Sequence, residues 1–126
     1  MNIPENYLFA KTHEWVKVLP NGNVLVGISD HAQELLSDIV FINLGEEGEE
    51  LSAKGPMGEV ESVKAVSEVY SPVSGTIVKV NQDVLDSPET VNSAPYDAWF
   101  VELENVSGQE ELLSPPDYEK LIAEEN

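Results

Sequence analysis

The sequence predicts a mainly β protein, folded as a sandwich or flattened barrel of short strands to which a few helices are added. Short apolar or alternating runs recur along the chain, and clusters of Gly, Pro, Asn, Asp and Ser separate them. Helical patterns are confined to one segment after the first hairpin and to segments near the C-terminus. The length of 126 residues suits one domain with a single hydrophobic core.

The N-terminal part predicts an irregular lead-in followed by a β-hairpin. Residues 4–11 show no strand or helix pattern. The runs 14–18 and 23–28 alternate or are continuously apolar, as strands do, and the turn residues Leu-Pro-Asn-Gly at 19–22 lie between them. We therefore expect two antiparallel strands joined by a tight turn.

A short helix is expected next, opened by residues 29–33. Asp30 is a suitable cap, and Gln33 lies three residues further on, as in a capping box. The apolar stripe of this helix comprises Ala32, Leu35, Leu36 and Ile39. The following run, 40–44, is too apolar for a half-exposed strand, so we expect it inside the sandwich.

The middle of the chain predicts a second hairpin with Lys64 at its tip. Strand-like residues at 57–60 and 68–70 surround a segment in which the chain must reverse. The residues at the reversal include no Gly, Pro, Asn or Asp, which normally form tight turns. Because breaches of a local rule are more expected at functional sites than elsewhere, Lys64 is a candidate functional residue.

The remaining elements complete the predicted sandwich. Residues 45–50 form an acidic turn, interpreted as a solvated loop because the spaced ligands of a calcium loop are missing. Residues 76–80 predict a strand with Thr76, Val78 and Val80 on one face and Ile77 and Lys79 on the other. Residues 81–98 predict a long loop.

The C-terminal part predicts one strand and two helices. Residues 99–103 form the strand, and residues 109–113 the first helix. The second helix begins at 114–117, because Ser114 can cap it and Pro is tolerated in a first turn.

The charge balance excludes several classes of partner. Six basic residues, all Lys, oppose 24 acidic ones, so the net charge is −18. Nucleic acids and anionic membranes would be repelled, whereas basic patches of partner proteins would attract this chain. The chain has no Cys, no signal-peptide pattern and no apolar run that could span a bilayer. We expect a soluble, cytoplasmic monomer.

Residues for catalysis or metal binding are scarce. His13 and His31 are the only histidines, and no cysteine is available as a nucleophile. No spaced ligand cluster supports a zinc site from these two residues, so no metal site is expected. The sequence indicates a protein that is not an enzyme.

A resemblance to a known family emerges from several motifs taken together. Residues 61–67, followed by 70–75, resemble the lipoyl-attachment hairpin of glycine cleavage system H proteins. The segments 13–15, 26–33 and 91–96 fit the same family in the same order. The resemblance covers nearly the whole chain, including its C-terminal helix.

The resemblance implies a lipoyl/biotinyl-type hybrid sandwich and a covalent lipoate on Lys64. It implies one lipoyl-carrier domain over 1–126, with the lipoyl hairpin at about 57–75 and a helical extension at about 109–124. The implied function is to shuttle the aminomethyl group of glycine from a pyridoxal-phosphate glycine decarboxylase to a tetrahydrofolate-dependent aminomethyltransferase. Dihydrolipoamide dehydrogenase then reoxidises the carrier, and a lipoate ligase or a lipoyl/octanoyl transferase attaches the lipoate.

By the same resemblance, a cleft protects the loaded arm, with Thr12, Glu14, His31 and Glu68 as its possible contacts. Thr12 stands where Ser is common, and Glu68 stands where Asp is common. Without the resemblance, His31 is a packing or capping residue and Glu14 an ordinary strand carboxylate. The chain also departs from the family before Trp99, because residues 97–98 replace a three-residue link that contains Gly.

Other functions remain open at this point. Biotin is a competitor for Lys64, but biotinylated lysines usually have Met on both sides, whereas Val63 and Ala65 flank this one. The lipoyl domains of 2-oxoacid dehydrogenase acyltransferases usually place an acidic residue directly before the lysine and lack the additional elements. Two further alternatives are an H-like relay of lipoyl or octanoyl groups and an unmodified acidic binding module.

Overall fold

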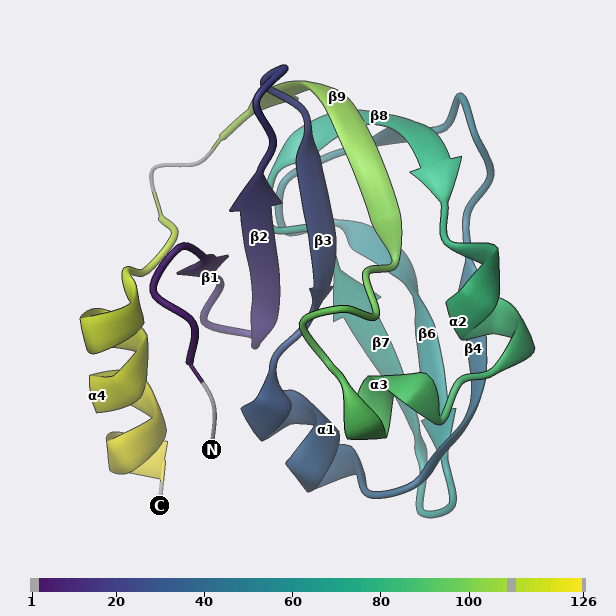
Figure 1. Cartoon of the computed structure of the whole chain (residues 1–126), viewed down its shortest axis with the longest axis vertical. Coiled ribbons are helices and arrows are strands. Elements are labelled where there is room, and N and C mark those ends of the chain that lie inside the picture. Colours follow the sequence, from purple (N-terminus) through teal and green to yellow (C-terminus); the bar gives the residue numbers. More distant parts are fainter. Residues whose placement is uncertain (1–2, 109–110, 126) are drawn as a thin grey trace.

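Two antiparallel sheets form the centre of the computed structural model, which describes residues 3–108 and 111–125 (Figure 1). The larger sheet has the order β1 (Leu8–Phe9), β2 (Glu14–Val18), β3 (Val24–Ile28), β9 (Val101–Ser107), β8 (Ser74–Val80) and β5 (Glu50–Leu51). The smaller sheet has the order β4 (Ile39–Leu44), β6 (Pro56–Ser62) and β7 (Val66–Tyr70). The helices are α1 (Asp30–Leu36), α2 (Gln82–Asp86), α3 (Thr90–Ser93) and α4 (Pro115–Glu125).

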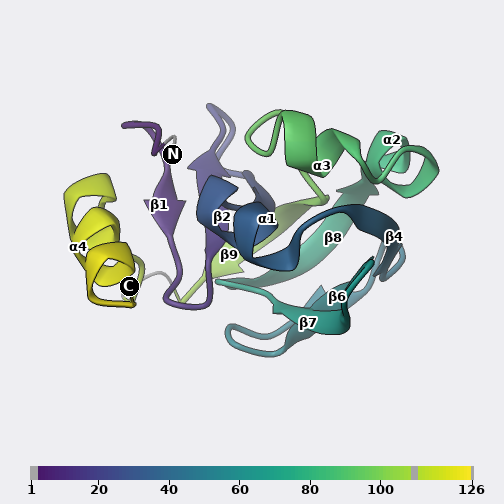
Figure 2. The ribbon, with the colours of Figure 1, turned by 90° about the horizontal axis from the view of Figure 1, so that it is seen from below.

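The main core lies between the two sheets. Figure 2 shows β6 and β7 on one side of β8 and β9. Buried side chains of the larger sheet, among them Val26, Ile77 and Leu103, belong to one cluster with Val60 and Val69 of the smaller sheet. The prediction of a mainly β flattened sandwich is confirmed, and its sheets are not closed into a barrel.

The first hairpin is confirmed, with its second strand beginning at Val24 instead of residue 23. Strands β2 and β3 pair in continuous register from Glu14 opposite Ile28 to Val18 opposite Val24. The predicted lead-in, however, contains β1, which pairs with β2. The sequence pattern missed this strand because two residues are too few to show alternation.

Helix α4 packs on β1 through a second cluster of buried side chains. This cluster comprises Phe9, Trp15, Tyr118 and Ile122. The rings of Phe9 and Tyr118 are stacked, with centroids 4.3 Å apart. The prediction that Ser114 caps this helix is confirmed, since its Oγ accepts a hydrogen bond of 3.4 Å from the Asp117 N–H.

The other predicted C-terminal helix is wrong in its described part. Residues 111–113 are not helical, and Leu113 forms an isolated bridge with Phe9 through backbone hydrogen bonds of 2.7 and 2.9 Å. Residues 109–110 of that prediction lie outside the described residues. A strand pairing with β1 therefore replaces a local helical turn, because the backbone of β1 supplies the hydrogen-bond partners.

The predicted cap of α1 is also wrong by one residue. Ser29 is the N-cap, and its Oγ accepts a hydrogen bond from the Ala32 N–H, whereas Asp30 is the first helical residue. Gln33 does not reach the backbone; its Nε2 donates to Asp30 Oδ1 at 2.8 Å. Leu35 is 58% exposed and Ile39 belongs to β4, so the buried stripe of α1 is narrower than predicted.

Strand β4 does not lie inside the sandwich as predicted. It occupies an edge of the smaller sheet, where Val40 and Phe41 are 53% and 55% exposed. Only Ile39 and Ile42 are buried, and the register shifts between Ile39 and Phe41. The bulge at this shift breaks the alternation, so Val40 and Phe41 are both exposed while Ile39 and Ile42 face the core.

The prediction of a long loop over 81–98 is wrong, because α2 and α3 lie within it. The polar residues that suggested a loop satisfy backbone groups instead. Asn92 Oδ1 accepts from the Ile39 N–H at 2.9 Å, and Asn92 Nδ2 donates to the Ser37 carbonyl at 2.8 Å. The Asn81 side chain caps α2 by accepting from the Asp83 N–H.

Strands β8 and β9 are longer than predicted. β9 begins at Val101 instead of residue 99 and continues to Ser107. In β8, Ile77 is buried while Lys79 is exposed, although simple alternation would give them one environment. A register shift between these two residues explains the difference. Among the described residues, no helix is long and apolar enough to cross a membrane.

Candidate functional site

Lys64 lies at the exposed tip of the β6–β7 hairpin, as predicted. Ser62 replaces the missing turn formers. Its Oγ accepts hydrogen bonds from the N–H groups of Lys64 and Ala65, at 3.2 and 3.3 Å, and its backbone N–H donates to the Ala65 carbonyl at 2.9 Å. A buried hydroxyl therefore holds the reversal that Gly or Asn usually provides.

The tip is also tied to the segment before β4. The Val63 N–H donates to the Asp38 carbonyl at 3.0 Å. Val63 is 66% exposed and Val66 is 57% exposed, so small or apolar side chains surround the lysine. None of the ion pairs among residues 3–108 and 111–125 involves Lys64. Its amine is accessible on a tip whose backbone is held in place.

We expect Ser62→Ala to loosen this tip without unfolding the sandwich. The change removes the acceptor for two N–H groups, which costs about 1–2 kcal/mol of local stability. Hydrogen exchange at the amides of Lys64 and Ala65 should therefore accelerate. Ser67→Ala in β7 is the control, and equal protection in wild type and Ser62→Ala would contradict this assignment.

Glu14 is a buried carboxylate between the two sheets. It is 3% exposed, and its oxygens accept hydrogen bonds from the Thr12 hydroxyl and, at 3.3 Å, from the Tyr70 N–H. Burial raises the pKa of Glu14 to about 7, although both hydrogen bonds act in the opposite direction. A carboxylate in this environment is a favourable neighbour for a cation, because a positive charge would offset the cost of ionising it.

A groove of about 680 Å³ lies next to the hydrogen-bond donors of Glu14, although Glu14 itself is not one of its lining residues. Thr12 and Tyr70, the two hydrogen-bond donors to Glu14, both line it, together with Ser71, Pro72 and the ion pair of Lys54 with Glu111. The sequence did not single out Tyr70 for this position. Its role depends on a backbone N–H, which carries no signal in a single sequence.

Strand β7 connects the tip with the groove. β7 is an edge strand, and its Tyr70 N–H points away from β6 to Glu14. Because backbone groups alternate along a strand, Val66 and Glu68 present their N–H groups to the same edge. The five residues of β7, from Val66 to Tyr70, correspond to about 16 Å of extended strand.

Glu68 lies on this path, exposed and opposite Glu59 of β6. Two carboxylates facing each other across a strand pair repel, so a cation near them would be stabilised. Of the four predicted arm contacts, the structure brings Thr12 and Glu14 into direct contact. Glu68 lies on β7, the strand whose Tyr70 N–H donates to Glu14.

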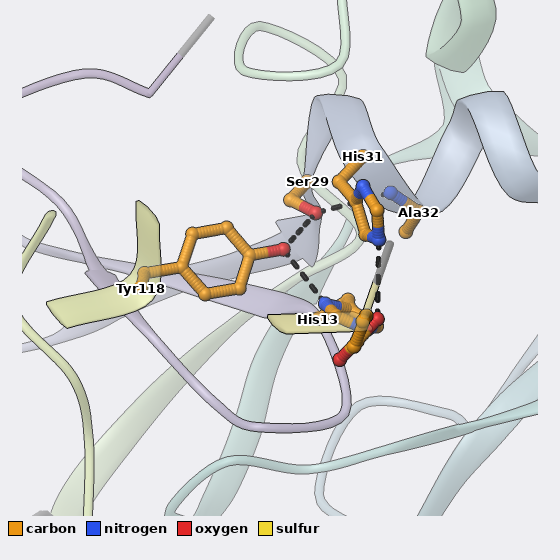
Figure 3. A network of polar contacts seen from close by, with 6 residues as sticks. His13, Ser29, His31, Ala32 and Tyr118 are labelled. Atoms are coloured by element: carbon orange, nitrogen blue, oxygen red, sulfur yellow. Dashed lines mark hydrogen bonds and ion pairs between the residues drawn. The ribbon is translucent and has the colours of Figure 1, made fainter. Parts of the chain in front are cut away.

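The fourth predicted residue, His31, lies in a different cluster (Figure 3). Its Nε2 is 3.3 Å from Glu125 Oε1, and the Nε2 of His13 is 3.1 Å from the same oxygen. His13 Nδ1 is 2.8 Å from the Tyr118 hydroxyl, which is 2.6 Å from Ser29 Oγ. Burial lowers the pKa of His13, and Glu125 partly opposes this effect.

The shortened link before Trp99 does not line the groove. Residues 97–98 follow Tyr96, whose hydroxyl accepts from the Asp30 N–H at 3.1 Å. Tyr96 and Asp97 line a second cavity of about 310 Å³, next to Asp30 of α1. The shortened link at residues 97–98 therefore borders a different cavity from the groove that Thr12 and Tyr70 line.

The chain resembles proteins of one family over nearly its whole length. A family model described as glycine cleavage H-protein matches residues 7–125. A glycine cleavage system H protein of Oceanobacillus iheyensis is 50% identical over 125 residues, which cover 97% of this chain and 98% of that protein. One from Lachnoclostridium phytofermentans is 44% identical over 125 residues, with 99% and 98% covered.

The fold agrees with this match. The crystal structure of a glycine cleavage system H protein from Mycobacterium marinum superimposes with a TM-score of 0.89 and 39% sequence identity, and the match covers 96% of this chain and 99% of that one. The sequence motifs, the sheet arrangement and the exposed lysine hairpin point in the same direction. The chain belongs to the glycine cleavage H-protein family.

Proposed function

We propose that this chain is a lipoyl carrier of the glycine cleavage system and that Lys64 is its attachment residue. The observation that carries the proposal is the accessible Lys64 amine on a tip held by Ser62, in a chain of this family. An attaching enzyme must reach the lysine Nζ, and a fixed exposed tip reduces the conformational entropy lost on docking.

The residues present fit a lipoyl group. Bound lipoate would supply the two sulfur atoms that this Cys-free chain lacks, and with them the carrier and redox chemistry. The chain's own contribution is binding and shielding. The apolar Val63 and Val66 flank the attachment residue, and the edge of β7 leads from there to Glu14.

Glu14, Thr12 and Glu68 are proposed to receive the cationic aminomethyl end of the loaded arm. Glu14 is the main acceptor, because its buried carboxylate is costly to ionise without a nearby cation. Thr12 and Tyr70, which line the groove, keep that carboxylate in position through their hydroxyl and N–H groups. His31 is assigned no such contact, because it lies with His13 and Glu125 instead.

The proposed partners are those of the family's reaction cycle. They are glycine decarboxylase, the aminomethyltransferase, dihydrolipoamide dehydrogenase and a lipoate ligase or lipoyl/octanoyl transferase. The net charge of −18 favours docking on basic surfaces of these proteins. We propose that the chain acts as a non-catalytic, single-domain monomer in the cytoplasm.

Intact mass after incubation with lipoate ligase, ATP and lipoate tests the attachment residue. We expect one added lipoyl group on wild type, none on Lys64→Arg, and one on Lys79→Arg, a matched control at another exposed lysine. Absence of added mass on folded wild type would leave an unmodified binding module. Addition to Lys64→Arg would move the attachment site elsewhere.

Glycine–bicarbonate exchange with glycine decarboxylase then tests the carrier function. Lipoylated wild type should support exchange, and lipoylated Glu14→Ala should support it less, because the cationic end loses its acceptor. A relay of lipoyl groups to other domains needs Lys64 but not Glu14. If lipoylated wild type transferred its lipoyl group to another domain and supported no exchange, the relay function would replace the carrier function.

A further inference from the structure

Three side chains with metal-ligating atoms meet at the end of α4, outside the proposed lipoyl site. His13 precedes β2, His31 lies in the first turn of α1, and Glu125 is the last residue of α4. Their ligand atoms all lie within 4.8 Å of one another. Glu125 is separated from His13 by 112 positions and from His31 by 94, so sequence spacing did not indicate the cluster.

The geometry of these atoms suits a small divalent cation. Both imidazole Nε2 atoms point at Glu125 Oε1, at 3.1 and 3.3 Å. In a tetrahedral zinc site with bonds of about 2.0–2.1 Å, neighbouring ligand atoms lie about 3.3 Å apart. We propose that His13, His31 and Glu125 form a Zn²⁺ site with a fourth, open position.

Differences in burial allow the cation to enter. The side chains of His13 and His31 are 14% and 5% exposed, whereas that of Glu125 is 37% exposed. The two rings are packed with centroids 4.7 Å apart, so they form the rigid part of the site. The Glu125 side chain can move toward solvent and leave room for an ion beside the two Nε2 atoms. Its carboxylate then coordinates that ion from the solvent side.

A second layer of hydrogen bonds orients His13 for this role. Zinc binding at Nε2 requires the ring proton on Nδ1, which then donates to the Tyr118 oxygen 2.8 Å away. The Tyr118 hydroxyl in turn donates to Ser29 Oγ at 2.6 Å, and that oxygen also accepts from the Ala32 N–H (Figure 3). The Tyr118 hydroxyl therefore links His13 to the N-cap of α1.

The backbone of His13 is held in a conformation that favours this arrangement. Its φ of 80° lies in the left-handed region, which non-glycine residues rarely adopt. Such a conformation persists only where surrounding contacts maintain it, and here it directs the ring toward α1 and α4. The bound ion would join the start of β2, α1 and the end of α4. This role is independent of lipoylation.

Calorimetric titration of the chelator-treated full chain with Zn²⁺ tests the site. We expect one ion per chain and a higher Tm with zinc than without. His31→Ala and Glu125→Gln should each weaken binding by at least about 10-fold, as losses around zinc sites commonly do. Glu125→Gln keeps the shape of an exposed side chain, so it remains informative if His31→Ala does not fold.

Glu124→Gln is the matched control, because it removes the same charge from the neighbouring exposed residue of α4. Its zinc affinity should equal that of wild type. Equal weakening in Glu124→Gln and Glu125→Gln would show diffuse binding to the acidic surface and overturn the proposal. Unchanged affinity in Glu125→Gln, or no binding to wild type, would leave a hydrogen-bonded cluster without a metal.

Discussion

Glu14→Gln is expected to remove a pH dependence of stability of about 3 kcal/mol between acidic and neutral pH. Burial raises the pKa of Glu14 from 4.5 to about 7 in the folded state. The folded chain therefore binds this proton more tightly than the unfolded chain does. The resulting stabilisation is complete below pH 4.5 and is lost as the pH rises through about 7.

Glutamine preserves both hydrogen bonds of Glu14. Its carbonyl can accept from the Tyr70 N–H while its amide donates to the Thr12 hydroxyl. The variant therefore lacks the ionisation and keeps the packing. At about pH 8 Glu14→Gln should be more stable than wild type by about 3 kcal/mol, and near pH 4 the two should be similar.

Urea unfolding at fixed ionic strength, from about pH 4 to about pH 8, measures this difference. Glu68→Gln is the control, because it removes the same charge from an exposed position. Self-repulsion among the 24 acidic residues changes with pH in all three proteins, so it largely cancels in the comparison. Parallel pH profiles for wild type and Glu14→Gln would show that Glu14 titrates normally.

Of the substitutions proposed here, Trp15→Ala should cause the largest loss of stability, about 3–5 kcal/mol. Trp15 is 0% exposed, and its ring packs against Tyr7 with centroids 5.0 Å apart. Gly27 lies opposite it across β2 and β3, and a Cβ there would meet the indole at 2.6 Å, so the ring packs directly on the backbone of β3. Its Nε1 also donates to the Pro95 carbonyl at 3.1 Å.

Such a loss is a large fraction of the 5–15 kcal/mol that holds a typical domain together. Urea unfolding followed by circular dichroism measures it without relying on the indole fluorescence. Val18→Ala on the same strand is the control, because Val18 is 53% exposed and its truncation should cost less than about 0.5 kcal/mol. A loss below about 1 kcal/mol for Trp15→Ala would contradict the packing described here.

Local patterns determined much of the architecture in advance. The mainly β fold, the first hairpin and the Ser114 cap follow from alternation, turn residues and capping, which act over a few neighbouring residues. The Lys64 tip follows from the strand-like runs on both sides of it. The same patterns were wrong where tertiary partners replaced local ones. Asn92 satisfies the backbone before and within β4, and β1 pairs with Leu113.

The sequence by itself determined which residues carry the family's motifs, Lys64 and Glu14 among them. Only the tertiary structure decided what surrounds them, because contacts between distant segments depend on strand order and layer packing. Glu14 meets the Tyr70 N–H because β2 and β7 belong to facing sheets. His13 and His31 meet Glu125 because α4 returns to β1, burying Tyr118 beside them, and no local pattern encodes that return.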